Sequence, residues 1–407
     1  MKKILQINAV YEEGSTGRTT KELNEYLQSR GYESRIAVSA GSQGENIFLI
    51  GNKFDHKLHA MFSRIFGLQG YFSYFATKDL LSYIDKEKPD VVHLRNLHGN
   101  FINLPLLFGY LSKKKIPTVI TLHDCWFYTG KCCHYTVIKC DRWKKDCGNC
   151  PKLHDDNVSL FFDHTRRQLK DKIKFIQSLP YVAVVGVSDW ITNEAKKSRV
   201  FKNVSNISRI YNWLELKQFH PIDSSELKKE LGLHDKFIIL SVASGWSEKK
   251  GLDKIFDLAK GLAEDVAIVL IGGYSANEKK IPKNILLAGT VRNPQLLSAY
   301  YSMADIYLNM SLEESFGKVS AEALACGTPV IAINSTANAE IIGPGCGFLF
   351  DKFDKEEILL TIKQVKKETK KKYESKCTQW ARKNFSKEIN AEEYIKIYEK
   401  VIGLKGI

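Results

Sequence analysis

A chain of 407 residues exceeds the length at which a single hydrophobic core usually stops growing, so its length predicts two domains. Hydrophobic residues make up 44% and charged residues 26%, a balance typical of globular proteins, and no apolar run approaches the roughly 18 residues that span a bilayer. The net charge of +14 is spread over both halves and accompanies no nucleic-acid-binding motif, which argues against a nucleic-acid partner.

Strand-like apolar runs alternate with helical segments in the first half of the chain. The runs occupy residues 4–10, 34–40, 90–96, 117–124 and 181–188. A helix is expected from Thr19 to Arg30, and this alternation is typical of parallel βαβ units. The opening run follows two lysines but lacks the small-residue cleavage site of a signal peptide. We therefore interpret it as the first core strand of a cytoplasmic protein.

A glycine-containing stretch, Gly14 to Gly17, directly follows the first predicted strand and opens the first helix. Glycines at this place allow a tight turn and present backbone N–H groups to an anion. Arg18 adds a positive charge that could approach a phosphate or an acceptor. The spacing differs from G-x-G-x-x-G and disfavours NAD, while a plain tight turn remains the alternative.

The segment from Met61 to Phe75 is dense in aromatic residues. It is too short to span a bilayer, but it could rest on a membrane surface or line an acceptor groove. A buried helix of the N-terminal core is the alternative interpretation.

Two histidines, His93 and His123, stand where predicted strands end. Ligands of open α/β sheets bind at the carboxyl ends of strands, so both positions favour function. Either residue could instead be a structural histidine. Asp124 could orient the imidazole of His123 or cap the following helix.

Six of the nine cysteines lie between Cys125 and Cys150. In a reducing compartment such a cluster favours a metal site or packed, redox-active thiols over permanent disulfides, and the three alternatives stay open. The last two cysteines have the Cys-x2-Cys spacing that lets two thiolates of one turn bind the same ion. The set expected for a structural zinc ion, without a role in bond making, is Cys132, Cys140, Cys147 and Cys150.

The second half of the chain repeats the alternation of strands and helices. Its strand-like runs occupy residues 237–244, 266–273, 285–291, 304–311 and 328–334. Helices are expected from Leu252 to Ala263 and from Val319 to Ala325. The prediction is an α/β protein with two Rossmann-like, doubly wound parallel-sheet domains.

The expected domain boundaries follow from a change in composition. A polar stretch containing a proline, near residues 212–225, separates the two sets of strands. The N-terminal domain is expected over residues 1–212, with a Cys-rich insertion at about 125–152, and the C-terminal domain over residues 213–385. Residues 386–407 form an amphipathic helix that we expect to pack back on the N-terminal domain.

Two lysines, Lys249 and Lys250, follow a predicted strand and precede the helix that starts at Leu252. Ammonium charge and the dipole of a helix N-terminus together suit a diphosphate. Ordinary surface lysines on a turn are the alternative.

The most informative stretch runs from Glu313 to Pro329. Glu314 and Glu322 are separated by seven residues, one in a loop and the other in the next helix. A carboxylate can accept the two hydrogen bonds that vicinal ribose hydroxyls donate. The intervening Phe316, Gly317 and Lys318 supply loop amides for sugar hydroxyls.

These motifs, in this order, resemble those of family 4 glycosyltransferases of the GT-B fold along nearly the whole chain. The segment from Glu314 to Ala323 matches the E-x7-E element of that family, and Cys326-Gly-Thr-Pro follows it. Supporting matches are Gly14 to Gly17, His123, Ser188, Asn212 and Lys250-Gly251. The stretch from Thr121 to Cys132, with the cysteines after it, resembles a subgroup of bacterial surface polysaccharide clusters such as colanic acid or capsule synthesis.

The resemblance implies a retaining transfer from a nucleotide-diphosphate sugar to a glycan or lipid-linked saccharide, in a cleft between an N-terminal acceptor domain and a C-terminal donor domain. It implies no cofactor at the catalytic centre. The catalytic residues on this pattern are His123, which contacts the sugar, Lys250, which neutralises the diphosphate, and Glu314, which positions the donor. The expected donor-binding set is Gly14, Gly17, Arg18, Lys249, Lys250, Glu314, Phe316, Gly317, Lys318, Val319 and Glu322.

The resemblance leaves some points open. A GT-B epimerase or phosphorylase, or a non-catalytic sugar-nucleotide-binding protein, has the same architecture. The subgroup's lipid-linked acceptors imply peripheral contact with the cytoplasmic face of the inner membrane. Two departures from the family pattern stand out: Gly245 replaces an arginine five residues before Lys250, and Ser335-Thr336-Ala337 replaces a Gly-Gly turn ahead of Glu340.

Overall fold

The computed structural model describes residues 1–42, 44–274 and 281–405. The chain forms two compact units. Unit 1 contains Met1–Ile210 and the residues from Asn390 onward, and unit 2 contains Tyr211–Ile389. The chain therefore returns to unit 1 after unit 2 is complete.

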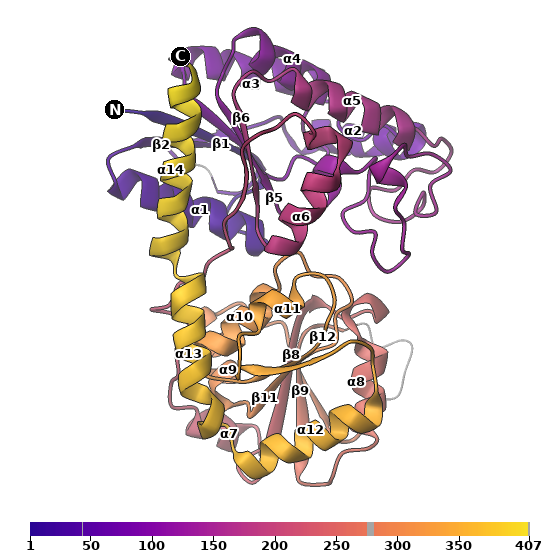
Figure 1. The fold of residues 1–407 in the computed structure, drawn as a ribbon, viewed down its shortest axis with the longest axis vertical. Coiled ribbons are helices and arrows are strands. Elements are labelled where there is room, and N and C mark those ends of the chain that lie inside the picture. Colours follow the sequence, from indigo (N-terminus) through magenta and orange to yellow (C-terminus); the bar gives the residue numbers. More distant parts are fainter. Residues whose placement is uncertain (43, 275–280, 406–407) are drawn as a thin grey trace. The chain divides into compact units, whose positions relative to one another are not determined.

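A parallel sheet forms the centre of unit 1 (Figure 1). Its strand order is β3-β2-β1-β4-β5-β6-β7, and all neighbouring strands are parallel. The order reverses between β1 and β4, and ligands of doubly wound sheets bind at the carboxyl ends of strands at such a switch point. The strands are β1 (Lys3–Val10), β2 (Glu33–Ala40), β3 (Ile47–Leu49), β4 (Val91–Leu94), β5 (Thr118–Leu122), β6 (Val182–Gly186) and β7 (Ile207–Arg209).

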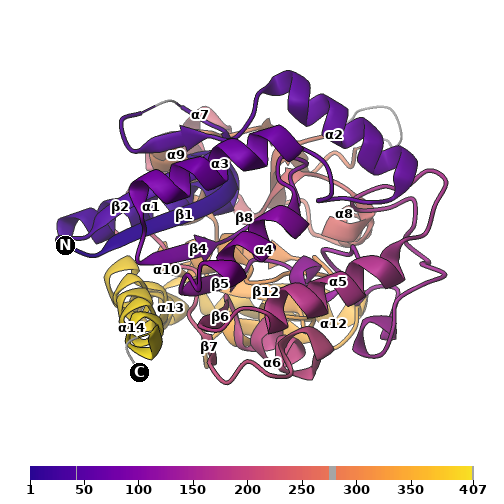
Figure 2. The same ribbon diagram turned by 90° about the horizontal axis from the view of Figure 1, so that it is seen from above.

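Helices cover both faces of this sheet (Figure 2). On one face, the Tyr26 hydroxyl of α1 donates to Glu392 of α14 at 2.7 Å. On the other face, α4 packs on α5 through stacked rings of Phe108 and Phe175, whose centroids are 5.4 Å apart. The helices of unit 1 are α1 (Gly14–Ser29), α2 (Lys53–Phe66), α3 (Tyr74–Glu87), α4 (Leu104–Lys113), α5 (Thr165–Gln177), α6 (Asp189–Lys197) and most of α14 (Lys387–Lys405).

Unit 2 has a second parallel sheet, with the order β10-β9-β8-β11-β12-β13. Its order reverses between β8 and β11, which places a second switch point there. The strands are β8 (Phe237–Gly245), β9 (Val266–Gly273), β10 (Ile285–Gly289), β11 (Ile306–Asn309), β12 (Val330–Ile333) and β13 (Gly347–Phe350). The helices are α7 (Ser225–Glu230), α8 (Leu252–Ala259), α9 (Pro294–Met303), α10 (Lys318–Ala325), α11 (Asn338–Ile341), α12 (Lys355–Glu368) and α13 (Lys371–Phe385).

The structure confirms the predicted fold class, because both units are parallel α/β sheets. The first helix begins at Gly14 rather than Thr19, since the glycine-containing stretch forms its first turn. The helix expected to reach Ala263 ends at Ala259. Three edge strands, β3, β7 and β13, were not predicted; each has only three or four residues, too few for a periodic pattern.

The aromatic segment between Met61 and Phe75 is not one buried helix, so that interpretation was wrong. It contains the end of α2, a loop and the start of α3. Met61, Phe66 and Phe75 are exposed, while the intervening loop is partly buried. Among the described residues, no helix is both long enough and apolar enough to cross a bilayer.

Candidate active site

The turn after β8 carries the two predicted phosphate-binding lysines. Lys249 and Lys250 lie in a short 3₁₀ turn, Glu248–Lys250, which Gly251 joins to α8. Gly251 has a φ of 76°, and a Cβ there would come within 2.4 Å of Met310. The Lys-Gly pair therefore lets the turn after β8 approach the loop after β11 closely.

Lys250 and Glu314, which belong to separate motifs, form an ion pair at this switch point. The Lys250 Nζ donates to Glu314 Oε1 at 2.7 Å and lies 3.5 Å from the Ser311 hydroxyl oxygen. The two loops are also joined through their backbones, because the Leu312 N–H donates to the Lys249 carbonyl at 3.3 Å. Both side chains retain solvent contact, so a ligand can reach them.

The loop that carries Glu314 is held by residues that stand where the family has a Gly-Gly turn. The Glu314 N–H donates to the Thr336 hydroxyl at 2.8 Å, and the Ala337 N–H donates to the Glu314 carbonyl at 3.2 Å. Thr336 has a φ of 50°, a left-handed conformation that a glycine would adopt without strain. The Thr336 hydroxyl thus fixes the loop of Glu314 although its backbone adopts a conformation that favours glycine.

Glu322 lies in α10 and is only 2% exposed. The Tyr301 hydroxyl donates to its Oε2 at 2.9 Å. Burial and the Glu322 charge raise the pKa of Tyr301, so this phenol stays a hydrogen-bond donor. Both Glu314 and Glu322 also act electrostatically on the ring hydroxyl of Tyr307 in β11, so both carboxylates lie near one strand.

The remaining predicted residues of this loop contribute in different ways. The Phe316 side chain packs against Tyr211 and Phe385, with centroids 5.9 and 5.4 Å away, so only its backbone can meet a donor. Gly317, with a φ of 82°, is the N-cap of α10 and makes no side-chain cap. Lys318 and Val319, in the first turn of α10, are partly exposed.

The position five residues before Lys250, where the resemblance leads one to expect an arginine, is occupied by Gly245. Gly245 ends β8, and the Trp246 N–H donates to the Gly273 carbonyl at 2.8 Å. Lys249 is exposed, whereas Lys250 is half-buried against Glu314. The structure therefore brings Lys250, but not Gly245, to the acidic loop.

In unit 1, three loops follow neighbouring strands at the other switch point. The Asn96 N–H, after β4, donates to the Asn8 side chain of β1 at 3.0 Å. Gly14 has a φ of 62°, and a Cβ on Gly17 would meet the Glu12 backbone at 3.1 Å. Arg18 donates to the Gly14 carbonyl at 3.3 Å. The Arg95 guanidinium, directly after β4, donates to the Thr19 hydroxyl of α1 at 2.8 Å, so the start of α1 lies beside the end of β4.

His123 directly follows β5, as the sequence predicted. Its Nε2 is buried and has no hydrogen-bond partner among the described residues. Burial and the nearby Arg95 charge hold the pKa of His123 well below its usual value, so the ring is neutral. A neutral imidazole with an unsatisfied nitrogen is suited to a hydroxyl group of a ligand.

Asp124 does not orient His123, so that alternative was wrong. One carboxylate oxygen accepts from the Trp126 N–H at 2.8 Å, just ahead of a short 3₁₀ helix whose N-cap is Cys125, and the other contacts His98 Nε2 at 2.8 Å. Burial alone would raise the pKa of Asp124, but the charge and hydrogen bond of His98 lower it to about 2. Burial by itself would lower the pKa of His98, but the charge and hydrogen bond of Asp124 raise it.

His93 is a structural residue rather than a strand-end ligand contact. It lies within β4 and is fully buried. Its Nε2 contacts the Thr121 hydroxyl and its Nδ1 the Tyr398 hydroxyl, each at 2.8 Å. His93 therefore helps to hold α14 against the sheet.

Several site residues escaped sequence reasoning. Tyr301 lies in a different helix from Glu322, and His98 lies 26 residues before Asp124, so no local spacing connects either pair. The one available signal was the position of His98, just after a predicted strand.

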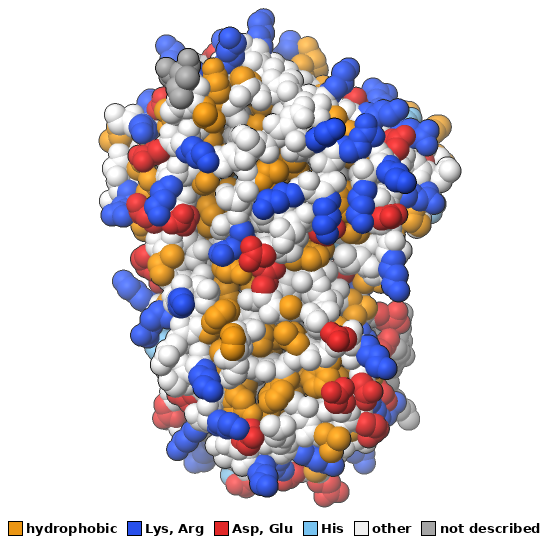
Figure 3. Space-filling view, viewed as in Figure 1, with side chains coloured by type: hydrophobic (Ala, Val, Ile, Leu, Met, Phe, Trp, Pro, Cys, Tyr) orange, Lys and Arg blue, Asp and Glu red, His pale blue; other side chains and the backbone are white. Residues whose placement is uncertain are grey.

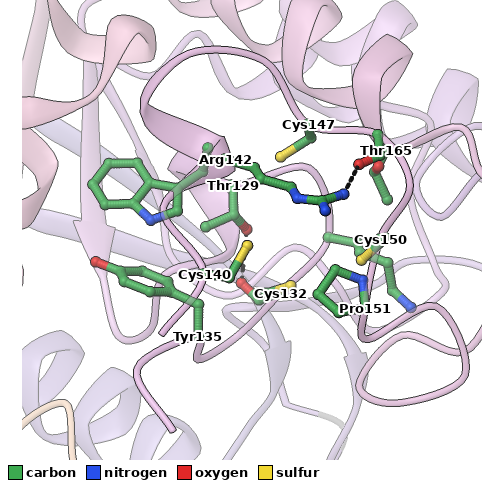
Figure 4. Close-up of a pocket in the computed structure, with 12 residues that line it drawn as sticks. Thr129, Cys132, Tyr135, Cys140, Arg142, Cys147, Cys150, Pro151 and Thr165 are labelled. Atoms are coloured by element: carbon green, nitrogen blue, oxygen red, sulfur yellow. Dashed lines mark hydrogen bonds between the residues drawn. The ribbon is translucent and has the colours of Figure 1, made fainter. Parts of the chain in front are cut away.

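The four predicted zinc ligands all line one pocket of unit 1 (Figure 4).

Two family models match the chain and together cover most of it. Residues 16–218 match the model described as Glycosyltransferase Family 4, and residues 223–384 match Glycosyl transferases group 1. A protein of Klebsiella pneumoniae named "Uncharacterized 41.2 kDa protein in cps region" is 25% identical over 327 residues, covering 79% of this chain and 81% of its own.

Two further similarities extend over nearly the whole chain. The putative colanic acid biosynthesis glycosyl transferase WcaC of Escherichia coli is 21% identical over 417 residues, covering 98% of this chain and all of its own. The crystal structure of Anabaena Alr3699/HepE in complex with UDP and glucose superposes with a TM-score of 0.69 at 15% identity, covering 98% of this chain and 100% of that one. At that identity the structural match bears on the fold alone.

Proposed function

The chain belongs to the family 4 glycosyltransferases, and from this premise we propose that it transfers a sugar from a nucleotide-diphosphate sugar to a saccharide or lipid-linked saccharide acceptor. The observation that carries the proposal is the pairing of Lys250 with Glu314 at the switch point of unit 2. Two motifs 64 residues apart converge there, next to the N-terminus of α10. The donor proposed here is of the same class as the UDP-glucose in the crystal structure of HepE, a protein that shares this fold.

Lys250 is the proposed counter-charge for the leaving diphosphate. Negative charge accumulates on the diphosphate as the glycosidic bond breaks, so a fixed ammonium stabilises the transition state more than the ground state. Glu314 holds the ammonium in place at 2.7 Å before the donor binds. The N–H groups at the start of α10 add partial positive charge.

Glu322 is proposed to bind the ribose of the donor. A carboxylate can accept several hydrogen bonds, so the bond from Tyr301 leaves it capacity for a sugar hydroxyl. Tyr301 acts here as a positioning residue, because it fixes the carboxylate and is itself fully buried.

We propose that transfer proceeds with retention of anomeric configuration and without a metal ion at the reacting centre. Lys250 and the helix N-terminus supply the positive charge that a divalent cation supplies in other transferases. Transfer without added magnesium or manganese is the expected result. His123 contributes the neutral ring that would contact the transferred sugar.

The biological setting proposed is synthesis of a bacterial surface polysaccharide. The support comes from the names of two relatives: one refers to a cps region and the other to colanic acid biosynthesis. A non-catalytic sugar-nucleotide-binding protein would bind the donor without turnover, and an epimerase or phosphorylase would release a product without a saccharide acceptor. Product analysis therefore separates the alternatives.

Donor binding can be tested with a thermal-shift screen of UDP-, GDP- and ADP-sugars. One nucleotide class is expected to raise the melting temperature by roughly 5–10 °C at a concentration of about 100 times Kd, because a ligand of the native state stabilises by mass action. The Glu322→Gln variant serves as the control and should show a smaller shift at the same concentration. No shift with any nucleotide sugar would contradict the proposed donor class.

We also propose that unit 1 rests on an anionic membrane surface through α2 and the segment that follows the cysteines. Lys53, Lys57, Met61 and Arg64 recur every three or four residues on the solvent-exposed side of α2. Phe162 stacks on Phe66 at the end of this helix, with centroids 6.4 Å apart.

The exposed residues of this surface combine apolar and basic side chains. Leu160, Phe161 and Phe162 are 50%, 69% and 49% exposed. Arg166 and Arg167, at the start of α5, are exposed beside them. Figure 3 shows another face of unit 1, on which lysine and arginine side chains are also more prominent than aspartate and glutamate. Aromatic side chains inserted at the headgroups and basic residues beside them are typical of interfacial binding.

Removing the two phenylalanines tests this surface. The double variant Phe161→Ser/Phe162→Ser should bind anionic vesicles at least about tenfold more weakly, since each buried phenylalanine contributes about 1.5–3 kcal/mol. Vesicle co-sedimentation with and without phosphatidylglycerol measures the change. Leu360→Ser is the matched control, because Leu360 is 64% exposed but lies in unit 2. Equal binding by both variants would overturn the proposal.

A further inference from the structure

Four cysteines of unit 1 surround a single small cavity. Cys132, Cys140, Cys147 and Cys150, here called the cysteine quartet, line it together with Lys131, Arg142 and Trp143. The cavity measures about 20 Å³, which is close to the space needed for one water-sized sphere. Figure 4 shows the four cysteine side chains gathered around it, with Cys147 and Cys150 contributed by one turn.

The backbone near the quartet is shaped for close approach. Gly148 has a φ of 129° and Asn149 a φ of 47°, which makes a tight turn between Cys147 and Cys150. A Cβ on Gly130 would come within 2.7 Å of the Thr165 carbonyl and 3.2 Å of the Cys147 side chain. A glycine is therefore required at position 130 for Cys147 to reach the cavity.

Basic side chains surround the quartet and hold its loops. The Lys131 Nζ donates to three carbonyls, those of Lys152, Leu153 and Asp155, at 2.7–2.9 Å. Arg142 donates to the Gly148 carbonyl at 2.6 Å.

Two more lysines hold the neighbouring loops and are also buried. The Lys172 Nζ donates to the Trp126 and Thr129 carbonyls, at 2.5 and 3.0 Å. The Lys152 Nζ donates to the His134 carbonyl at 2.9 Å and contacts the Asp156 carboxylate at 2.7 Å. Lys131, Lys152 and Lys172 are each at most 6% exposed. Lys152 is paired with the Asp156 carboxylate, but the hydrogen bonds of Lys131 and Lys172 go to carbonyls. Burying such ammonium groups is costly unless negative charge lies nearby.

We propose that the cysteine quartet binds one zinc ion as a structural site. Four thiolates around Zn²⁺ carry a net charge of −2, which complements Lys131 and Arg142 at the cavity and the buried Lys172 of a neighbouring loop. The ion would join the turn at Cys147–Cys150 to the loops of Cys132 and Cys140. The site is independent of the donor and acceptor proposed above.

Zinc binding would require a small inward movement of the thiols. Among the described residues, no three sulfurs of the quartet lie within 4.8 Å of one another. A Zn–S distance of about 2.3 Å corresponds to sulfurs roughly 3.8 Å apart in a tetrahedron. Rotation about χ1 of cysteines on loops can supply this change, with release of the thiol protons.

A second group of potential ligands is less suitable. Donor atoms of His98, Asp124 and Cys133 lie within 4.8 Å of one another. His98 Nε2 and Asp124 Oδ2, however, are already 2.8 Å apart in a direct hydrogen bond. An ion with ligands at about 2.0 Å holds nitrogen and oxygen roughly 3.3 Å apart, so it would have to break this pair.

Metal analysis of the full chain, purified under reducing and chelator-free conditions, tests the proposal. Wild type and the matched control Cys133→Ser should each contain one zinc ion per chain, and Cys147→Ala/Cys150→Ala should contain none. Cys140→His should keep zinc, because three cysteines and one histidine also form a tetrahedral site, whereas Cys140→Ala should lose it.

A measurement on wild type keeps the test decisive if the double variant does not fold. Titration with a mercurial reagent should release zinc in step with the loss of quartet thiols. Zinc-free wild-type protein would overturn the proposal, as would a Cys132–Cys150 disulfide found by mass spectrometry of protein kept under reducing conditions. Zinc retained by Cys140→Ala at one ion per chain would overturn the proposed ligand set.

Discussion

Replacing Lys250 with alanine is expected to lower kcat by about 100- to 1,000-fold, the range seen when one preorganised charge-stabilising donor is removed from an active site. The lysine acts on charge that develops on the leaving diphosphate, so the loss should fall mainly on kcat rather than on donor affinity. Initial-rate kinetics with the donor from the thermal-shift screen measure both quantities. Lys250→Arg should recover part of the rate, because it keeps the charge.

The neighbouring lysine offers a matched control. Lys249→Ala removes an equal charge from the same turn, but Lys249 is exposed and Lys250 is the residue paired with Glu314. If Lys249 supplies the second charge in place of the missing arginine, its variant should lose about tenfold in kcat/KM, less than the Lys250 variant. Equal rates for Lys250→Ala and wild type would refute the role of Lys250 in the reaction.

Replacing Glu322 with glutamine is expected to weaken donor binding at least about tenfold, since a hydrogen bond to a charged group contributes about 1.5–3 kcal/mol. A ribose contact is made in both the ground state and the transition state. The donor KM should therefore rise while kcat changes little. This pattern is the opposite of the one expected for Lys250, so the two roles can be told apart in one assay.

Glutamine is the preferred replacement because Glu322 is buried against Tyr301. Alanine would leave a cavity and an unpaired phenol, and would lower stability as well as affinity. Tyr301→Phe is the control: it keeps the carboxylate but removes the hydrogen bond at its Oε2, so donor affinity should fall by a smaller factor. An unchanged donor KM in Glu322→Gln, with a melting temperature near that of wild type, would exclude Glu322 from the ribose site.

Much of the fold could be predicted because long parallel strands have a strong local signal. The central strands of both sheets are continuous apolar runs, and their lengths and spacing identify βαβ units without any partner. The short edge strands β3, β7 and β13 have no such signal, since their pairing depends on a neighbouring strand. The first turn of α1 was missed because its two glycines favour a loop in isolation.

The residues of the candidate site also differ in whether the sequence could predict them. Lys250 and Glu314 could be proposed from sequence because each follows a predicted strand that ends at a switch point. Two pairs could not be proposed from the sequence, because each joins residues of different elements: Tyr301 with Glu322, and His98 with Asp124. For Phe316 the motif was misleading about the side chain: it was predicted to bind the donor, but its ring is buried in the core.

The amino-acid sequence by itself determined the two parallel α/β domains and the family, because periodicity and motif spacing are local properties of the chain. For the same reason it determined that Lys250 and Glu314 follow strands and that Glu322 lies in the next helix. Only the tertiary structure decided which side chains meet. In it Lys250 pairs with Glu314, His93 contacts Tyr398 of α14, and Asp124 contacts His98. It also brings the cysteine quartet around one cavity. The three pairs join residues at least 26 positions apart in the sequence, so they depend on the order of the strands, and the quartet depends on how its loops pack.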